Sequence, residues 1–330
     1  MKAAYLEKTG PPEVIVYGDL PRPEPSPTQV LVRVKAVAVN PIDTYIRSGA
    51  IAMELPMPYL IGCDLAGEVE AVGREVHRLS IGDRVWGSNQ GMLGRQGTFA
   101  EWAAVEEHWL YRTPEGVNDQ SAVAVALVGL TAWLGLFRRA AVQRGEALFV
   151  NGGTGGVGSM VVQMAKAVGA RVITTAGSDA KVEAARRLGA DVAVNYRNDQ
   201  VDDAIRRFAP EGIDVWWETL REPDFERTVS HLAPRGRMIV MAGRDARPVF
   251  PVGPFYVKDG SILGFAMFNA LPDEQQKAAE QINRWLASGQ LKPRIDRVMP
   301  LSEAAEAHRI QQRSTIEKTG ELSGKIVLVP

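Results

Sequence analysis

The chain has 330 residues, of which 45% are hydrophobic and 23% are charged, and its formal net charge is −1. This length can build two domains with their own cores, and the composition is that of an ordinary soluble globular protein. The near-zero net charge gives no electrostatic reason to expect nucleic acid or an anionic membrane as a partner. No run of 18 apolar residues occurs, and the first residues lack the apolar segment of a signal peptide. The single cysteine, Cys63, excludes an internal disulfide, so we expect a cytoplasmic protein.

The first third of the sequence is typical of a β-rich module. Short runs rich in Val, Ala and aromatic residues alternate with Pro and Gly, which predicts a series of short strands. The predicted strands are Lys2–Tyr5, Val14–Tyr17, Val30–Val39, Ala66–Val72, Arg84–Gly87 and Phe99–Val105. Such a series favours a barrel-like all-β fold over repeated βαβ units.

From Asp119 onward, helices and strands alternate. The predicted strands are Ala147–Val150, Arg171–Thr175, Val192–Asn195, Val215–Glu218, Arg237–Met241 and Ser261–Phe265. The predicted helices are Gln120–Arg139, Ser159–Val168, Asp179–Leu188, Val201–Phe208 and Pro223–His231. This alternation predicts an α/β fold, a doubly wound parallel sheet of the Rossmann type.

The last 60 or so residues extend beyond that sheet. An amphipathic helix at Pro272–Ala287, a strand, a helix at Leu301–Gln312 and a closing strand at Lys325–Val329 are expected to return to the N-terminal module. The sequence therefore predicts two domains, one formed by residues 1–122 and 269–330, the other by residues 123–268.

A glycine-rich turn is the most informative motif. Residues 153–158, GTGGVG, fit G-x-G-x-x-G between the strand that ends at Val150 and the helix near Ser159. Glycines let backbone N–H groups approach a pyrophosphate, and the helix directs its positive N-terminus at that anion. The sequence thus predicts a dinucleotide site.

The residues after the second strand of this domain favour NADPH over NADH. NAD sites place an Asp or Glu there for the ribose hydroxyls, whereas this chain has Ala176. Gly177 and Ser178 leave space and donors for a 2′-phosphate, and Lys181 can reach it. A second interpretation, that Lys181 only solvates a helix start, stays open. Asp179 is predicted to cap the helix that follows.

Several motifs in their order and spacing resemble the medium-chain dehydrogenase/reductase superfamily over the whole chain, within it the zinc-free zeta-crystallin/quinone oxidoreductase group. These motifs are VNPIDTYIRSG (39–49), GCDLAGEVEAVG (62–73), GDRVW (82–86), GLTAW (129–133), GTGGVG (153–158), VNYR (194–197) and SGKIVLVP (323–330). The resemblance implies a GroES-like barrel domain that carries catalysis and a Rossmann domain that binds the cofactor. It also implies a homodimer, formed through the Rossmann domains.

The resemblance further implies that zinc is absent. A catalytic zinc needs a Cys, a His and a further Cys or acid. The first Cys position is Asn40 and the His position is Cys63, and the four histidines are scattered. Cys63 is interpreted as a small buried residue rather than a reactive thiol.

The N-x-x-D-x-Y segment provides the candidate catalytic residues. By the resemblance, Asn40 and Tyr45 orient the nicotinamide and a substrate carbonyl, while Asp43 fixes the loop. A plain polar turn after a strand is the alternative. Relatives often carry a second tyrosine a few residues later, where this chain has Ile51.

The remaining cofactor contacts are carried over by the same resemblance. They are Thr131 at the nicotinamide end; Thr154, Gly155, Gly156 and Val157 at the pyrophosphate; Gly177, Ser178, Lys181 and Tyr196 at the adenosine phosphate; Met241, Ala242, Gly243 and Arg244 in the crevice; and Phe265, Ala266 and Met267 near the nicotinamide.

Without a metal to polarise an alcohol, the acceptor should need little acid assistance. The leading hypothesis is therefore NADPH-dependent reduction of quinones. One alternative is reduction of α,β-unsaturated carbonyls, namely enals, enones or enoyl thioesters. The other is a cofactor-binding, crystallin-like protein with little catalysis.

Overall fold

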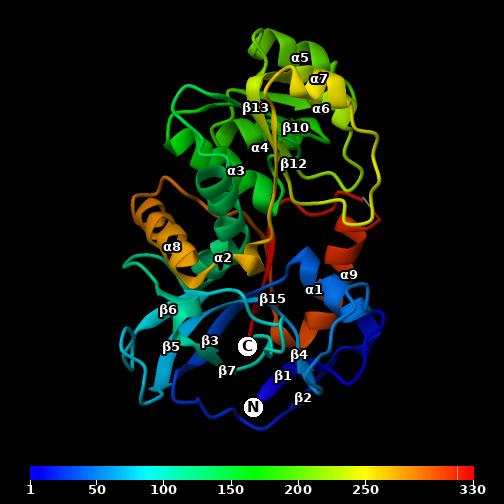
Figure 1. The fold of residues 1–330 in the computed structure, drawn as a ribbon. Helices are drawn as coiled ribbons and strands as arrows, with labels where there is room; N and C mark the ends of the chain where they lie inside the picture. Colours follow the sequence, from blue (N-terminus) through cyan, green and yellow to red (C-terminus); the bar gives the residue numbers. More distant parts are fainter. Residues whose placement is uncertain (318) are drawn as a thin grey trace. The chain divides into compact units, whose positions relative to one another are not determined.

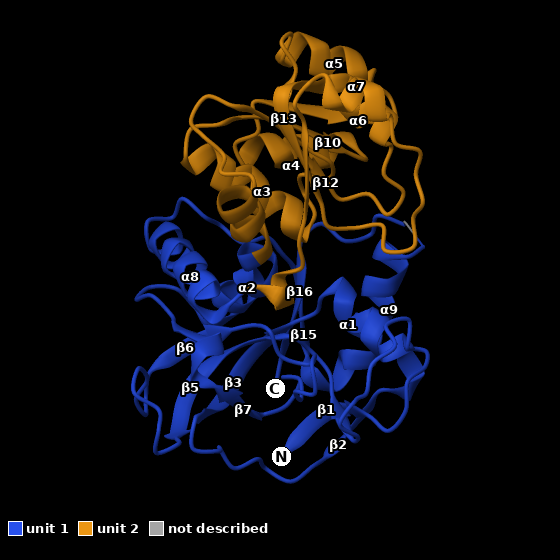
Figure 2. Cartoon of the chain, viewed as in Figure 1, with its two compact units in different colours: residues 1–130, 271–330 blue, residues 131–270 orange. Residues whose placement is uncertain are grey.

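The computed structural model describes residues 1–317 and 319–330, which form two compact units (Figure 2). Unit 1 comprises Met1–Leu130 and Leu271–Pro330, and unit 2 comprises Thr131–Ala270. The sequence predicts the domain boundaries after residues 122 and 268, whereas the structure divides the chain after residues 130 and 270. Helix α2 (Asp119–Trp133) is continuous across the first of the observed divisions, so no break in the chain marks it.

Unit 1 is built on two β-sheets (Figure 1). The larger, seven-stranded sheet has the order β15-β16-β3-β5-β6-β8, and β7 also pairs with β3; the smaller has the order β2-β1-β4. The strands are β1 (Lys2–Leu6), β2 (Val16–Asp19), β3 (Gln29–Ala38), β4 (Tyr59–Leu60), β5 (Asp64–Val72), β6 (Arg84–Gly87), β7 (Trp102–Glu106), β8 (Leu110–Arg112), β15 (Ile295–Pro300) and β16 (Lys325–Val329). The helices are α1 (Pro41–Ser48), α8 (Pro272–Ala287) and α9 (Ala304–Thr315), with 3₁₀ turns at Pro12–Val14, Glu107–Trp109 and Leu301–Glu303.

The C-terminal segment returns to the N-terminal sheet, as the sequence predicts. Strand β16 pairs antiparallel with β3, with Val327 opposite Ala38, and parallel with β15. This pairing places the start of β16 next to the end of β3, where the N-x-x-D-x-Y segment begins. Residues almost 290 positions apart in the sequence therefore meet there.

Unit 2 is a Rossmann-type α/β fold, which confirms the predicted fold class. Its six strands are all parallel in the order β11-β10-β9-β12-β13-β14. The strands are β9 (Ala147–Val150), β10 (Arg171–Ala176), β11 (Val192–Asn195), β12 (Ile213–Glu218), β13 (Leu232–Val240) and β14 (Ser261–Gly264). The helices are α3 (Gly156–Ala167), α4 (Asp179–Arg187), α5 (Val201–Phe208), α6 (Phe225–His231) and α7 (Val252–Tyr256), with a π-helical segment at Leu134–Arg139 and a 3₁₀ turn at Met267–Asn269.

The tryptophan pair on β12 belongs to the core of unit 2. Trp216 and Trp217 are both fully buried, and the Trp216 ring stacks on Phe149 with 3.9 Å between the ring centroids. Consecutive strand residues face opposite sides of the sheet, so burial of both requires cover on both faces. Both tryptophans therefore pack in the core rather than at a ligand site.

Helix α1 replaces the polar turn that was one interpretation of the N-x-x-D-x-Y segment. Asn40 occupies the N-cap position, Pro41 is the first helical residue, and Asp43 accepts a 2.7 Å hydrogen bond from the Asn40 backbone N–H. Gly49 ends the helix with φ of 80°. Pro at the start, a carboxylate at the third position and Gly after the end are the usual helix boundary signals.

Strand β13 starts at Leu232, five residues before the predicted start at Arg237. The pairing of β12 with β13 shifts register between Ile213 and Val215, and Arg235 has a positive φ of 61°. A bulge breaks the alternation of buried and exposed residues, so this part of the strand leaves no periodic pattern in the sequence.

The apolar stretch Asp119–Arg139 forms the one helix, within the described ranges 1–317 and 319–330, that is long and apolar enough to cross a membrane by length and composition. Its most apolar window is 72% buried inside the protein. Burial of this kind is a property of a core helix in a folded domain.

Candidate cofactor and catalytic sites

The glycine turn between β9 and α3 is packed too tightly for side chains at two of its positions. A Cβ atom on Gly153 would lie 2.3 Å from Thr174 Oγ1, and one on Gly158 would lie 2.3 Å from the Gly152 carbonyl oxygen. Gly155 is different, because its Cβ would be 3.4 Å from its nearest neighbour. Gly153 and Gly158 are thus required for the turn itself, and they let α3 start directly beside the end of β9.

Two threonines at the end of β10 hold the turn in place. Thr174 Oγ1 accepts a 2.9 Å bond from Gly153 N and donates a 2.7 Å bond to the Val150 carbonyl. Thr175 Oγ1 accepts a 3.2 Å bond from Gly152 N. These two backbone N–H groups are therefore satisfied within the protein. From the sequence alone, the two threonines are recognisable only as strand residues; their pairing with the turn follows from the parallel register of β10 and β9.

The N-terminus of α3 has the properties of an anion site. Its N-cap residue, Gly155, is extended and offers no side-chain cap. The first N–H groups of a helix have no acceptor inside it, so those of Gly156, Val157 and Gly158 point out of its end with the positive end of the helix dipole. A 12-residue helix with this end and a tight glycine turn fits a pyrophosphate. The predicted contacts Thr154, Gly155, Gly156 and Val157 all lie here.

Asn151 and Glu218 mark the point where the strand order of unit 2 reverses. Asn151 directly follows β9, and Glu218 is the last residue of the neighbouring β12; ligands of open α/β sheets bind at such a point. Asn151 Nδ2 lies 3.0 and 3.1 Å from the two Glu218 carboxylate oxygens, and Leu220 N donates to the same carboxylate at 2.7 Å. Burial raises the pKa of Glu218. Sequence reasoning missed both residues, although their position at strand ends was a usable signal.

The predicted adenosine-phosphate residues also gather at one place. Tyr196 follows β11, and its hydroxyl lies over Gly177, where an added Cβ would be only 2.6 Å from it. Ser178 is the N-cap of α4 and accepts a bond from Lys181 N. The prediction that Asp179 caps this helix is wrong: Asp179 is its first helical residue, and its carboxylate accepts a 2.7 Å bond from Asn195 Nδ2.

The other predicted cofactor residues of unit 2 follow its remaining strands or begin the unit. Met241, Ala242, Gly243 and Arg244 come directly after β13, and Phe265, Ala266 and Met267 come directly after β14, so both sets lie at carboxyl ends of strands. Thr131 is buried in α2. Phe265 is half-buried, and its ring meets Trp217 edge-on with 6.3 Å between the ring centroids.

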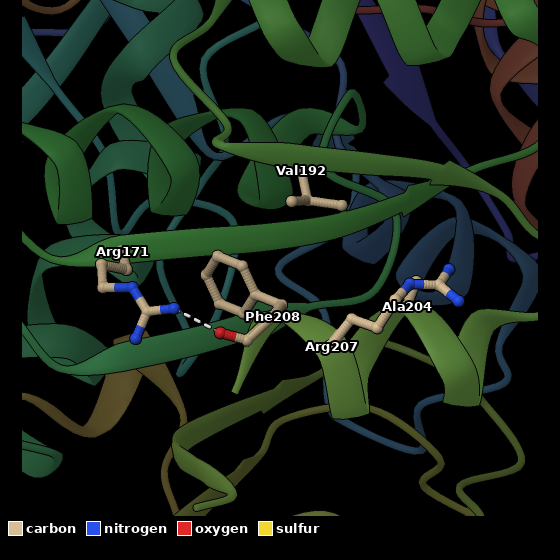
Figure 3. A pocket seen from close by; sticks show the side chains of 5 residues that line it. All are labelled: Arg171, Val192, Ala204, Arg207 and Phe208. Atoms are coloured by element: carbon tan, nitrogen blue, oxygen red, sulfur yellow. Dashed lines mark hydrogen bonds between the residues drawn. The ribbon is translucent and has the colours of Figure 1, made fainter. Parts of the chain in front are cut away.

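A shallow surface pocket of unit 2 lies away from this edge. It is lined by Arg171, Val192, Ala204, Arg207 and Phe208 (Figure 3). Arg171 is the first residue of β10 and pairs in register with the first residue of β9. The pocket therefore lies at the amino ends of the strands, opposite the glycine turn, and does not belong to the dinucleotide site.

In unit 1, Asn40 is the centre of a buried polar network. Its Nδ2 donates to Asp64 Oδ2 at 2.8 Å and to the Ala38 carbonyl at 3.3 Å, and its Oδ1 accepts from Lys325 Nζ at 2.5 Å. Ser88 Oγ donates to the other Asp64 oxygen at 2.6 Å. Asn40 is fully buried, and both of its amide hydrogens are used inside the unit. Sequence reasoning found Asn40 but missed Asp64 and Lys325.

Cys63 and Asp43 form the second half of this network. The Cys63 thiol donates to Asp43 Oδ1 at 3.0 Å, and Cys63 is fully buried, as expected. Burial raises the pKa of the thiol well above its ordinary value and raises the pKa of Asp43 to about 7. Tyr45, on the same helix as Asp43, is half-buried.

The donor set at these positions does not fit a zinc ion. A zinc site requires thiolate, imidazole or carboxylate ligands that point at one centre. Here the Asn40 amide presents hydrogens to Asp64 and Ala38, and burial disfavours the Cys63 thiolate. In the described part of the chain, no group of three or more His, Cys, Asp or Glu residues is placed to hold a metal.

The glycine turn gives a direct test of its packing. We expect Gly158→Ala to lower the free energy of unfolding by about 1–3 kcal/mol because its methyl group overpacks against the Gly152 carbonyl. Replacing a glycine inside a helix by alanine otherwise raises the free energy of unfolding by as much as about 1 kcal/mol. A decrease in Gly158→Ala would therefore indicate the steric clash. Gly155→Ala is the matched control and should change stability by less than about 0.5 kcal/mol. Urea denaturation measures both, and equal stabilities of the two variants would contradict the close approach.

Comparisons with known proteins agree with this architecture. Residues 26–115 match the family model of the alcohol dehydrogenase GroES-like domain, and residues 156–284 match that of the zinc-binding dehydrogenase. Human quinone oxidoreductase is 34% identical over 331 residues, which cover 100% of this chain and 98% of that protein. A solved structure of an NAD-dependent alcohol dehydrogenase has a TM-score of 0.89 at 31% identity, with 100% of both chains covered. A mycobacterial protein complexed with NADPH has a TM-score of 0.86 at 28% identity, again with 100% of both covered.

These similarities extend over the whole chain, and both units take part in them. They confirm the family that the sequence motifs indicate, and with it the GroES-like and Rossmann-type folds. The chain is an oxidoreductase that belongs to the medium-chain dehydrogenase/reductase family, in the group of the zeta-crystallin-like quinone oxidoreductases.

Proposed function

We propose that this protein uses NADPH to reduce quinones without a metal. The observation that carries the proposal is the N-terminus of α3, where the first backbone N–H groups, which have no acceptor inside the helix, follow a tight glycine turn. Similarity to human quinone oxidoreductase supports the acceptor class. Similarity to a mycobacterial protein complexed with NADPH supports the cofactor.

The residues at the end of β10 support NADPH rather than NADH. Ala176 ends this strand, so no carboxylate is supplied there for the ribose hydroxyls. The nearest carboxylate, Asp179, is held by Asn195. In the proposal, the first turn of α3 binds the pyrophosphate, and Ser178, Lys181 and Tyr196 bind the 2′-phosphate.

The chemistry of the acceptor follows from what unit 1 can offer. Bound NADPH supplies a hydride equivalent, and a quinone accepts it with little acid assistance. Both amide hydrogens of Asn40 and the thiol hydrogen of Cys63 are committed to buried partners. We therefore assign Asn40 to holding the start of α1, and Tyr45 to donating a hydrogen bond to the acceptor oxygen.

A panel of acceptors tests this function. NADPH oxidation should be faster with simple quinones than with enals or enones, because a quinone is already a strong electron acceptor. Treatment with a chelator should leave the rate unchanged, since the polar cluster has no suitable zinc ligands. A clear preference for enones would support the alternative reductase, and no turnover with either class would support a cofactor-binding protein. Loss of activity on chelation, restored by zinc, would refute the metal-free reaction.

Calorimetry tests the cofactor preference. Wild-type protein should bind NADPH more tightly than NADH, and Lys181→Ala should weaken NADPH about ten- to a hundred-fold, because a charge-assisted phosphate contact contributes about 1.5–3 kcal/mol. NADH is the internal control, and its affinity should change less than about two-fold. Equal affinities of the wild-type protein for the two cofactors would rule out the assignment.

We also propose that two copies of the chain pair through unit 2. Strand β14 is the edge of the parallel sheet, and an unpaired edge is a template for another strand. Exposed apolar side chains near this edge in the sequence are Val249, Val252, Tyr256, Val257 and Ile262. A two-fold pairing of β14 would extend the sheet and cover apolar surface.

Light scattering at micromolar concentration tests the assembly. The wild-type mass should be that of a dimer, and Ile262→Lys should shift it toward the monomer, because a charge on the edge strand disfavours pairing. Val16→Lys is the matched control: Val16 is an exposed apolar residue on β2, an edge strand of unit 1. A wild-type monomer, or a dimer that Ile262→Lys leaves intact, would exclude this interface.

A further inference from the structure

Lys325 is a buried lysine at the start of the last strand. Its side chain is only 5% exposed, and its Nζ donates to the Val39 carbonyl at 2.7 Å and to Asn40 Oδ1 at 2.5 Å. An ammonium group removed from water is costly unless its charge is balanced and its hydrogens are bonded. The charge that balances it must lie within the same network.

The balancing charge is on Asp64, and the Asn40 carboxamide connects the two. Asn40 accepts from Lys325 with its oxygen and donates to Asp64 with its nitrogen. Within the described residues, Asp64 also accepts hydrogen bonds from Ser88 Oγ and Leu127 N, which are neutral groups. Among the described contacts, then, the ammonium of Lys325 supplies the positive charge that faces this buried carboxylate through the amide.

This arrangement gives the Asn40 amide one preferred orientation. A flipped amide would place its NH₂ group against the ammonium and its oxygen against the carboxylate, and both contacts would be repulsive. Asn40 is also the N-cap residue of α1, and Tyr45 lies on that helix. The orientation of Asn40 therefore bears on how the helix that carries Tyr45 begins.

We propose that Lys325 is a positioning residue for the reaction. It balances the charge of Asp64, fixes the Asn40 carboxamide, and through Asn40 sets the start of α1 and the position of Tyr45. It also gives the cluster a positive charge at a place where the amide and thiol do not fit a metal ion. The part of this inference that concerns Tyr45 rests on the proposed quinone reduction; the charge balance does not.

The first test measures charge balance by stability. Lys325→Met should lower the melting temperature, because it leaves Asp64 as an uncompensated buried charge. Adding Asp64→Asn should then raise the melting temperature above that of Lys325→Met alone. If Asp64→Asn only damaged packing, it would lower the melting temperature further. A rise in melting temperature therefore indicates charge balance, and a fall indicates a packing effect. Lys166→Met, which removes a half-exposed partner of Asp191 in unit 2, is the control that Asp64→Asn should not rescue.

The second test measures positioning. A crystal structure of Lys325→Met should show the Asn40 side chain shifted or in two positions, because its oxygen loses the ammonium donor, whereas Lys325→Arg, which keeps the charge, should retain one position. The kcat for a quinone should fall by up to about ten-fold in Lys325→Met, because Tyr45 is misplaced but a quinone needs little acid assistance, while NADPH affinity changes less than about two-fold. Combining Lys325→Met with Tyr45→Phe should lower kcat by less than the product of the separate losses.

Three results would overturn the proposal: an unchanged position of the Asn40 side chain in Lys325→Met, a melting temperature of the Lys325→Met/Asp64→Asn variant below that of Lys325→Met, or losses of kcat that multiply when Lys325→Met is combined with Tyr45→Phe. If Lys325→Met does not fold, the melting temperatures of Lys325→Arg and of Lys325→Met/Asp64→Asn can still be compared with that of the wild-type protein. If the wild-type protein does not reduce quinones, the proposed function fails, whereas the position of the Asn40 side chain and the melting temperatures still test Lys325 separately.

Discussion

The approach of α3 to the end of β9 is the constraint on which the proposed nucleotide site depends. The Gly158 Cα sits so close to the Gly152 carbonyl that no side chain fits, and Gly153 meets Thr174 in the same way. The N–H groups of Gly152 and Gly153 are bonded to threonines, whereas those of the first turn of α3 have no acceptor inside the helix. The turn is thus held rigidly by its bonds to the threonines, while the N–H groups at the start of α3 can still donate to a ligand. Recognition of a pyrophosphate needs both properties.

The polar cluster of unit 1 differs from the glycine turn, because its buried polar groups form hydrogen bonds with one another. Asn40, Asp64 and Lys325 join the end of β3 to the starts of β16 and β5, and Asp43 with Cys63 adds a second buried pair. A closed network of this kind has little capacity left to bind a metal or a substrate through these atoms. Its function in this account is to hold α1 in one place, so that Tyr45 meets the acceptor in a defined position.

Most of the fold could be predicted from the sequence, because strands and helices in unit 2 carry clear periodic patterns and glycine signals. Strands β9 and β11 and helix α5 have the predicted bounds. Helix α1 was missed because its eight residues follow a strand and look like a polar turn, and the start of β13 was hidden by a bulge. The candidate site was predictable only where a local motif exists. Lys325 and Asn40 are 285 residues apart, and only the pairing of β16 with β3 shows that they touch.

The measurement that tests the central claim most directly is the response of single backbone amides to NADPH. In an amide NMR spectrum of the protein, the resonances of Gly156 and Val157 should shift strongly when NADPH binds, because these N–H groups gain a phosphate acceptor. Those of Gly152 and Gly153 should move little, since their bonds to the threonines are already made. If Gly156 and Val157 stay unchanged while residues around Arg171 and Arg207 respond, the dinucleotide binds elsewhere and the account is wrong.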